Sequence, residues 1–152
     1  MAASPAKFTL KKFYVKDLSF ETPNSPQMFT EEWEPDMDLQ LANRSSALGD
    51  DHYEVILQVT VTAKLKDKTA FLAEVHMAGI YQLTGLGEKE IINLTSTSCC
   101  QILFPYVREV VSDVVTRGGF PPLLLQPINF EALYYQHLQE EGKSQQNDES
   151  KH

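Results

Sequence analysis

Residues 50–65, DDHYEVILQVTVTAKL, carry the clearest structural pattern in the sequence. Every odd position from Tyr53 to Leu65 is apolar, whereas most even positions are polar. Because successive side chains of a strand point to opposite faces, this alternation predicts a half-buried strand of an antiparallel sheet. The turn at 66–68 leads into a second alternating stretch, residues 70–83, which predicts its hairpin partner. Leu72 and Ile80 make the outer face of this partner more apolar than a fully solvated face.

Two further strands are expected before this hairpin. In residues 8–20 the apolar residues alternate in three pairs, and the register changes between pairs, which predicts one long strand with a bulge or bend. Residues 37–41 alternate at period two, and the polar stretch 43–51 is expected to end that strand. An irregular aromatic loop with Phe29 and Trp33 separates the two strands.

The apolar period then changes from that of a strand to that of a helix. A stripe of valines and a leucine predicts a helix from about residue 90, with a kink at Pro105 and an end at Arg117 and the glycines that follow. Asn129 is an N-cap for a second helix, which Gly142 is expected to end. Four strands followed by two helices predict an α+β domain with a four-stranded antiparallel sheet and both helices packed on one face. The domain spans 8–141, between a flexible N-terminus at 1–7 and a disordered tail at 142–152 without apolar residues.

Composition narrows the class of protein. Acidic residues outnumber basic ones by 21 to 13, and the net charge of −8 disfavours nucleic acid and anionic lipid as partners. The two cysteines are adjacent and provide no disulfide framework, and no secretory signal is visible. The longest uncharged run, 91–107, contains a proline and is a poor membrane span. We therefore expect a cytoplasmic protein without direct membrane insertion.

No catalytic constellation is visible in the sequence. The four histidines are scattered, the glycine pair at 85–87 completes no nucleotide motif, and no nucleophile–base motif is present. We expect neither enzyme activity nor a cofactor nor a metal site. Cys99 and Cys100 fit buried packing better than redox chemistry, which stays the weaker alternative. The stretch FPPLLLQP, 120–127, is either a crossover loop packed on the core or a wall of an apolar groove opposite Phe29 and Trp33.

Five blocks of this sequence form a recognisable series. They are KDLSFETPNSP (16–26), Trp33-Glu34-Pro35, residues 50–65, TAFLAEVHMAGIY (69–81) and ILFPYVREVVSDVVTRGGFPPLLLQPINFEALY (102–134). In order and spacing these blocks resemble the SecB family of bacterial protein-export chaperones. The resemblance runs from about residue 8 to 138, with NLTSTSCC (93–100) unmatched. It implies a SecB-like sheet-and-helix subunit and a homotetramer built as a dimer of dimers.

The resemblance also implies a function. Members hold precursor proteins unfolded in the cytoplasm without ATP and deliver them to the SecA motor of the Sec export pathway. Matched positions give three sets: a client groove (Phe29, Trp33, Phe120, Leu123, Leu125, Phe130, Leu133), a SecA contact (Asp17, Glu21, Leu72, Glu74) and a subunit interface (Ala73, Val75, Met77). A chaperone of the same fold dedicated to one partner outside general export is the alternative. A small enzyme with its site in the aromatic groove is the rival from another class.

Overall fold

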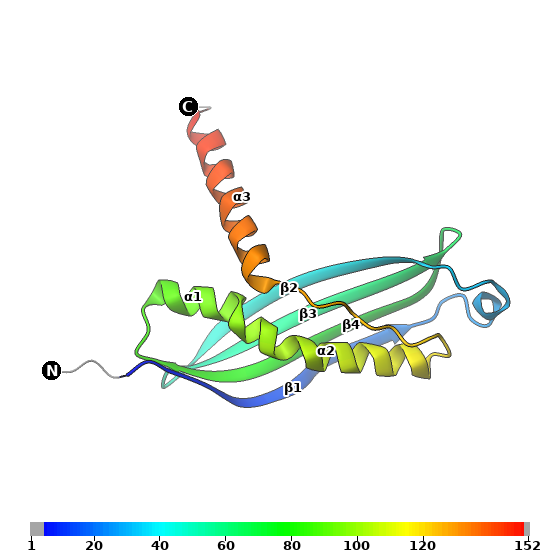
Figure 1. Ribbon diagram of the computed structural model, residues 1–152, viewed down its shortest axis with the longest axis horizontal. Helices are drawn as coiled ribbons and strands as arrows, with labels where there is room; N and C mark the ends of the chain where they lie inside the picture. Colours follow the sequence, from blue (N-terminus) through cyan, green and yellow to red (C-terminus); the bar gives the residue numbers. More distant parts are fainter. Residues whose placement is uncertain (1–4, 151–152) are drawn as a thin grey trace.

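A computed structural model describes residues 5–150 of the chain. One antiparallel sheet has the strand order β1-β4-β3-β2 and consists of β1 (Lys7–Glu21), β2 (Asp36–Gly49), β3 (His52–Leu65) and β4 (Lys68–Thr84). Three helices follow, α1 (Glu88–Ser96), α2 (Ser98–Arg117) and α3 (Phe130–Ser150). Figure 1 shows α1 and α2 lying along one face of the sheet, while α3 projects away from it. The predicted four-stranded antiparallel sheet with helices on one face is confirmed, but those helices are α1 and α2, whereas the second predicted helix is α3 and does not pack on that face.

Two tight hairpins join β2, β3 and β4. Their turn residues, Asp50 with Asp51 and Lys66 with Asp67, all have positive φ angles, as in the two-residue turns whose twist matches that of the flanking strands. The prediction that 43–51 is a loop is wrong, because β2 continues to Gly49 and pairs with β3 along its whole length. The second half of β2 lies at the sheet edge and is exposed on both faces. Because neither face is buried, the strand can pair with β3 without alternating apolar residues.

Strand β1 is one long strand with two irregularities, as the register changes in its sequence predict. Its pairing with β4 shifts between Leu10 and Lys12 and again between Val15 and Asp17. Each shift returns the next apolar pair to the side of the sheet that the helices cover, since all six apolar residues pair with odd-numbered positions of β4. These residues are Phe8 and Leu10, Phe13 and Val15, and Leu18 and Phe20.

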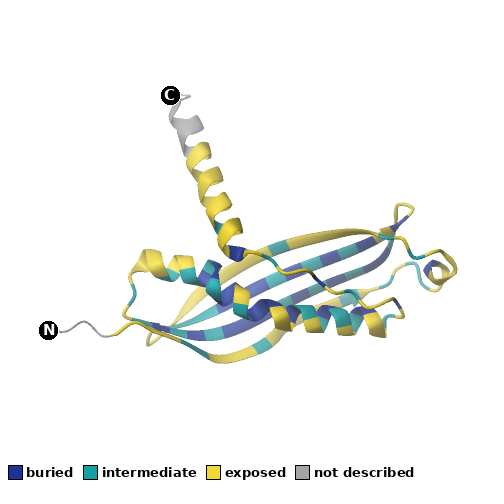
Figure 2. Ribbon diagram, in the orientation of Figure 1, coloured by how far each residue is buried: buried dark blue, intermediate teal, exposed yellow. Residues whose placement is uncertain are grey.

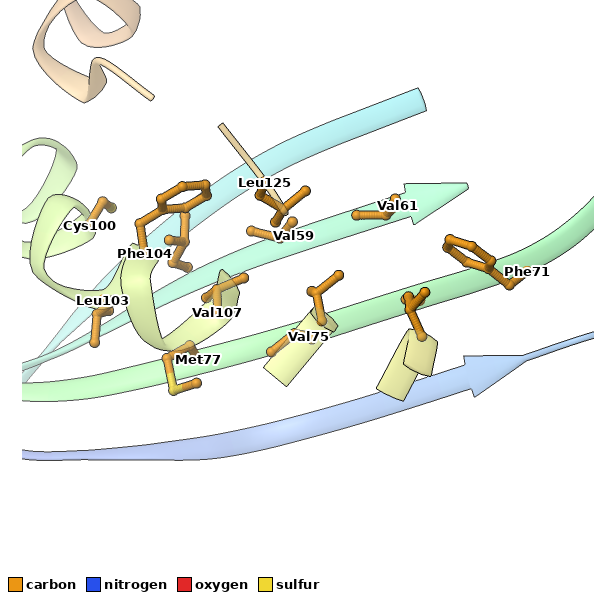
Figure 3. Packing of buried hydrophobic residues seen from close by; sticks show 14 of the residues in the cluster. Val59, Val61, Phe71, Val75, Met77, Cys100, Leu103, Phe104, Val107 and Leu125 are labelled. Atoms are coloured by element: carbon orange, nitrogen blue, oxygen red, sulfur yellow. The ribbon is translucent and has the colours of Figure 1, made fainter. Parts of the chain in front are cut away.

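The core lies between the helix side of the two central strands and α2. Figure 3 shows the side chains that meet there, and Figure 2 shows that the buried residues concentrate in β3, β4 and α2, whereas the edge strands and α3 are largely exposed. The odd-numbered residues of β3 from Val55 to Leu65 are all buried, as their alternation predicts. Full burial of each large apolar side chain contributes about 1.5–3 kcal/mol, so this layer supplies most of the stability of the fold. The central members are Val59, Val61, Val75, Met77, Leu103 and Val107.

The helical segment after β4 is broken, which the sequence pattern does not show. Thr97 has φ −118° and ψ −84°, and it separates α1 from α2 inside the segment that matched no family block. Its hydroxyl donates to the carbonyl of Asn93 at 2.8 Å, which satisfies a group at the end of α1. The predicted end of α2 is confirmed, since Arg117 is its last residue and Gly119 follows with φ 92°.

Helix α3 begins where predicted and ends later. The side chain of Asn129 accepts a hydrogen bond from the backbone N–H of Ala132 at 3.0 Å, which confirms the N-cap. The helix then passes Gly142 and reaches Ser150, so the predicted stop at Gly142 is wrong, while the disorder of the tail stays a prediction. Residues 151–152 of the predicted tail and 1–4 of the predicted N-terminal end lie outside the described residues. None of the described helices is both long and apolar enough to cross a membrane.

Candidate functional site

An aromatic cluster occupies the helix side of the sheet near the C-terminal end of α2. The Trp33 ring lies 5.2 Å from the Phe120 ring and 6.2 Å from the Phe71 ring, and Phe29 lies 5.2 Å from Phe120. Phe20 of β1 contacts Phe71 from the other side at 5.9 Å. Residues far apart in the sequence therefore form one aromatic surface, and the structure brings together three of the predicted groove residues.

Two glycines allow this close packing. A Cβ atom at Gly118 would lie 2.5 Å from the ring of Phe20, so a larger residue there would displace the ring. Gly119 has φ 92°, which disfavours other residues, and a Cβ there would lie 3.0 Å from Phe29. The Arg117-Gly118-Gly119 sequence thus ends α2 and also lets the chain pass close to the aromatic rings.

The members of the cluster differ in their exposure. Phe29 is 49% exposed, Trp33 is partly buried, and Phe120 is buried together with Phe71. Phe120 therefore forms the floor of the cluster and is covered by the outer rings. A molecule binding from solvent would meet Phe29 and Trp33 first.

The leucine-rich loop between α2 and α3 packs partly on the core and partly presents apolar surface, so both interpretations of its sequence hold for different residues. Leu125 is buried against the core, and its carbonyl accepts a hydrogen bond from Arg108 Nε at 2.7 Å. The same guanidinium lies 5.1 Å from the centre of the Phe104 ring. Leu123 is partly buried, whereas Leu124 is 68% exposed. One part of the loop is a core element and the other presents apolar surface.

A groove of about 700 Å³ lies at the base of α3, between this helix, α1 and β2. Phe130 at the start of α3 is buried and belongs to its inner end, and Leu133 is 43% exposed on its wall. The structure therefore divides the predicted groove residues between two places, the aromatic cluster and this α3 groove. Figure 1 shows the loop 120–128 running along the helix side of the sheet from one place to the other. Other apolar residues that line the α3 groove are Leu39, Leu41, Ile92, Tyr134 and Leu138.

The predicted SecA-contact residues gather on the opposite side, the outer face of the sheet. Asp17 pairs with His76 across β1 and β4, Glu21 pairs with Leu72, and Glu74 lies between these two rows. All four predicted residues therefore share one face, which no helix covers.

Hydrogen bonds hold the carboxylate of Glu74 in place. Its Oε1 accepts from the Thr60 hydroxyl at 2.9 Å and from Gln58 Nε2 at 3.0 Å, and its Oε2 lies 3.4 Å from His76 Nε2. The hydrogen bond from Thr60 contributes most to a lowered pKa of Glu74, with a smaller contribution from His76. Glu74 is therefore a fixed negative charge on the outer face at neutral pH.

The buried cysteines and the scattered histidines do not form a reactive site. Burial raises the pKa of the Cys99 and Cys100 thiols to about 12, so both are protonated at neutral pH and are poor nucleophiles. Across the described residues, no three histidine, cysteine or carboxylate side chains form a group that could hold a metal ion.

Comparison with known proteins gives the family. The family model described as SecB, preprotein translocase subunit SecB, matches residues 1–141. The chain belongs to the SecB family. Two similar relatives, both called protein-export protein SecB, come from Nitrosococcus oceani and Methylococcus capsulatus. The first is 56% identical over 89% of this chain and 84% of its own length, and the second is 52% identical over 88% and 86%.

A solved structure supports the SecB-like fold independently of sequence. The SecB-like chaperone of Mycobacterium tuberculosis, solved in complex with a peptide from an antitoxin, superposes with a TM-score of 0.68. The superposition covers 80% of this chain and 91% of the other at 17% sequence identity. At that identity the likeness concerns the fold of the SecB subunit alone.

The SecB subunit interface expected at or near Ala73, Val75 and Met77 stays a prediction. Their side chains are 0–2% exposed within a single subunit, so they leave little surface of their own for a second subunit. An effect of these residues on assembly could also act through the packing of α2 on the sheet.

The β2 and α1 side of the α3 groove is not among the predicted groove residues. Leu39 and Leu41 lie in a predicted strand, and Ile92 lies at the start of the predicted helical segment. The period-two pattern of β2 carried a signal, since it places these leucines on the helix side of an edge strand that α2 does not reach. For a SecB-family subunit, such exposed apolar residues are candidates for ligand contact.

Proposed function

We propose that this chain is an ATP-independent chaperone that keeps precursor proteins unfolded and delivers them to the SecA motor of the Sec export pathway. Its relatives are protein-export proteins, and membership in this family separates the chain from enzymes. The observation that carries the proposal is the separation of two surfaces. Exposed apolar side chains lie on the helix side, and carboxylates, of which hydrogen bonds fix Glu74, lie on the outer face of the sheet. One subunit can therefore hold a client on one side and contact a partner on the other.

Client binding requires several apolar contacts at once. Burial of one apolar client side chain contributes about 1.5–3 kcal/mol, whereas association costs about 4–15 kcal/mol before any net affinity appears. A single contact is therefore too weak. We place one subsite at the aromatic cluster and a second at the α3 groove, joined along the loop 120–128 where Leu124 is exposed. An extended client segment that occupies both subsites gains affinity from their linkage.

The chemistry of these subsites suits many different clients. Phe29, Trp33 and Leu133 offer apolar surface without a fixed set of polar groups that would select one sequence. Folded proteins bury their own apolar side chains, so the subsites favour chains that have not yet folded. A holdase of precursor proteins needs this kind of selectivity.

The outer face is our proposed SecA contact. Glu21 lies across from Leu72, Glu74 follows two residues along β4, and Asp17 lies beyond it opposite His76, so negative charge extends along the face to one side of an apolar residue. Charges around an apolar contact speed association and set the choice of partner. We infer that a cationic surface of SecA binds here, while the client stays on the helix side.

The SecB family assignment also supports assembly as a homotetramer, a dimer of dimers, in the cytoplasm. On the helix side, both edge strands carry apolar side chains that are about 40% exposed in the single subunit. Exposed apolar surface of this extent is typical of proteins that associate, and subunits packed along these edges would cover it. The residues concerned are Phe8, Phe13, Val15, Leu18 and Met37.

A chaperone dedicated to one partner outside general export is the second candidate. The SecB-like chaperone of Mycobacterium tuberculosis was solved in complex with a peptide from an antitoxin. A chaperone of this fold can therefore bind a peptide from a single named partner protein. The presence of all three matched carboxylates, Asp17, Glu21 and Glu74, on the outer face favours delivery to SecA for the present chain. The names of its relatives, which are about half identical to it, favour the same function.

Two assays with the purified protein test the proposal. Without nucleotide, it should suppress the aggregation of a denatured, slow-folding precursor, and titration calorimetry should detect binding to purified SecA. Suppression without SecA binding would favour the dedicated chaperone, and failure of both would overturn the proposal.

A further inference from the structure

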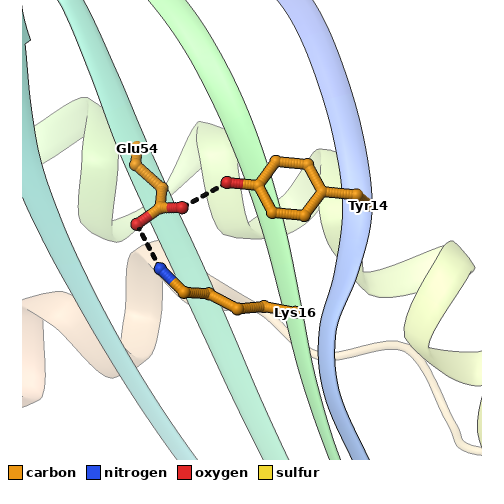
Figure 4. Close-up of polar contacts among 3 residues, drawn as sticks. All are labelled: Tyr14, Lys16 and Glu54. Carbon is orange, nitrogen blue, oxygen red and sulfur yellow. Dashed lines mark hydrogen bonds and ion pairs between the residues drawn. The ribbon is translucent and has the colours of Figure 1, made fainter.

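A three-residue cluster crosses the outer face beside the proposed SecA contact. Tyr14 and Lys16 come from β1, Glu54 comes from β3, and all three meet above the central strand β4 (Figure 4). Lys16 Nζ lies 2.8 Å from Glu54 Oε1, and the Tyr14 hydroxyl donates to Glu54 Oε2. Each oxygen of the carboxylate therefore has its own donor, and the Glu54 side chain is only 14% exposed.

Lys16 stands at the boundary of the acidic surface. It occupies the register shift between Val15 and Asp17, so it directly precedes one of the proposed SecA-contact carboxylates. Figure 4 shows its side chain running across β4 to Glu54. Among the described side chains, the structure gives Lys16 an ion pair with Glu54 and gives Asp17 none.

A lysine released at this position would change the charge of the contact surface. Its stem is long and flexible, and the carboxylate of the next residue is within its reach. Pairing with Asp17 would neutralise one of the three carboxylates of the proposed SecA contact. The position that Lys16 takes therefore determines how much negative charge a cationic partner meets.

We propose that Glu54 is a positioning residue for partner binding, because it holds Lys16 away from Asp17 and keeps the acidic surface charged. This inference rests on the proposed SecA contact and adds a residue outside it. The Tyr14 hydrogen bond fixes the orientation of the Glu54 carboxylate, so the three residues act as one unit.

The ionisation of the cluster agrees with this role. The hydrogen bond from Lys16, followed by that from Tyr14, lowers the pKa of Glu54 below its usual value of 4.5. The hydrogen bond to Glu54 raises the pKa of Tyr14 to about 12, so tyrosine remains a donor at neutral pH. Glu54 is a carboxylate with two donors throughout the neutral range and can hold the lysine ammonium there.

Substitution of Glu54 tests the inference. Glu54→Gln keeps the shape of the side chain but removes its charge, so the ion pair that holds Lys16 is lost and its ammonium is free to favour the charged Asp17. Titration calorimetry at low salt should show SecA binding weakened by about three-fold, the size expected for one exposed ion pair. The difference should disappear at about 1 M salt, where screening acts over only about 3 Å. Suppression of client aggregation should stay unchanged, since the client subsites lie on the other side of the sheet.

Two double variants separate this mechanism from a general effect of net charge. Lys16→Gln in the Glu54→Gln background should restore SecA affinity, because no lysine is left to approach Asp17. Lys12→Gln in the same background is the matched control. It removes one positive charge from the same strand and face, but Lys12 pairs with Ile80, four residues along β4 from the partner of Asp17. It should restore little.

The outcomes are distinguishable. Equal recovery with both double variants, or unchanged affinity in Glu54→Gln, would overturn the role of Glu54. The single variant Lys16→Gln provides a further check, and its affinity should equal that of wild type because Lys16 is already held away. An increase as large as the loss in Glu54→Gln would contradict the inference. If wild-type protein did not bind SecA at all, the proposed SecA contact itself would fail, and this inference with it.

Discussion

Phe29→Ala is the most informative change on the client side. Phe29 is 49% exposed and packs its buried half against Phe120. Full burial of a side chain of this size yields about 1.5–3 kcal/mol, so a client that covers the exposed half gains about 0.7–1.5 kcal/mol. At 1.4 kcal/mol for each factor of ten, the variant should bind a client about three- to ten-fold more weakly at this subsite.

Fluorescence anisotropy with a short labelled apolar peptide is the appropriate assay. A short peptide engages one subsite, so avidity between subsites does not mask the loss. The fold should survive, because only half of the ring is buried, and loss of its contacts should lower Tm by a few degrees.

Tyr135→Ala is the matched control for this change. Tyr135 is 65% exposed on α3 and lines neither client subsite, so its loss should leave peptide affinity unchanged. If Phe29→Ala bound the peptide as tightly as wild type, the aromatic cluster would not be a client subsite. An equal loss in both variants would mean that general surface apolarity, and no defined subsite, holds the client.

Three further changes test other parts of the account. Glu74→Lys should weaken SecA binding by roughly ten-fold or more in calorimetry and leave client holding intact, since it reverses a fixed charge on the outer face; equal loss of both activities would contradict the separation of surfaces. The lowered pKa of Glu54 stabilises the fold fully above pH 4.5, and this contribution is lost as the pH falls through the lowered value. The Tm advantage of wild type over Glu54→Gln should therefore shrink on acidification, and an advantage that grew would refute the assignment. Arg108→Ala should cost about 1–3 kcal/mol and speed proteolysis of the loop 120–128, because the buried carbonyl of Leu125 loses its donor; unchanged proteolysis would show that the hydrogen bond does not hold the loop.

The central hairpin was predictable because the alternation of apolar and polar residues along each strand shows directly which side chains are buried. In β3 every odd-numbered residue from Val55 to Leu65 is buried on the helix side, so burial and alternation coincide. The register changes in β1 were equally informative, since a bulge is the simplest way to return each apolar pair to the same face. The N-cap at Asn129 and the glycines after Arg117 likewise act through neighbouring backbone groups.

Features that depend on distant partners were not predictable from the pattern. The polar half of β2 is a strand because β3 offers its hydrogen-bonding edge, and its own side chains carry no signal of this pairing. The break at Thr97 is a backbone conformation between two helices, and no glycine or proline occupies the site. The cluster of Tyr14, Lys16 and Glu54 joins two strands that are not neighbours, so only the strand order reveals it.

In the candidate sites, too, some features follow from the sequence and others depend on contacts with distant residues. Resemblance to the SecB family placed the acidic residues and Leu72 on one face, and the register of β1 and β4 agrees. It could not distinguish a groove wall from a core residue. Phe120, Leu125 and Phe130 are buried, while Leu124 is exposed in the same loop. Burial depends on how the loop 120–128 crosses the sheet, which sequence spacing does not specify.

The most direct test of the central claim is dilution of a denatured, export-type precursor into an excess of this protein without nucleotide. Size-exclusion chromatography with light scattering would then measure the mass of the complex. The account predicts a stable complex of the precursor with a homotetramer, in which the precursor remains protease-sensitive and unfolded. A protein that elutes alone while the precursor folds or aggregates at its unassisted rate would contradict it.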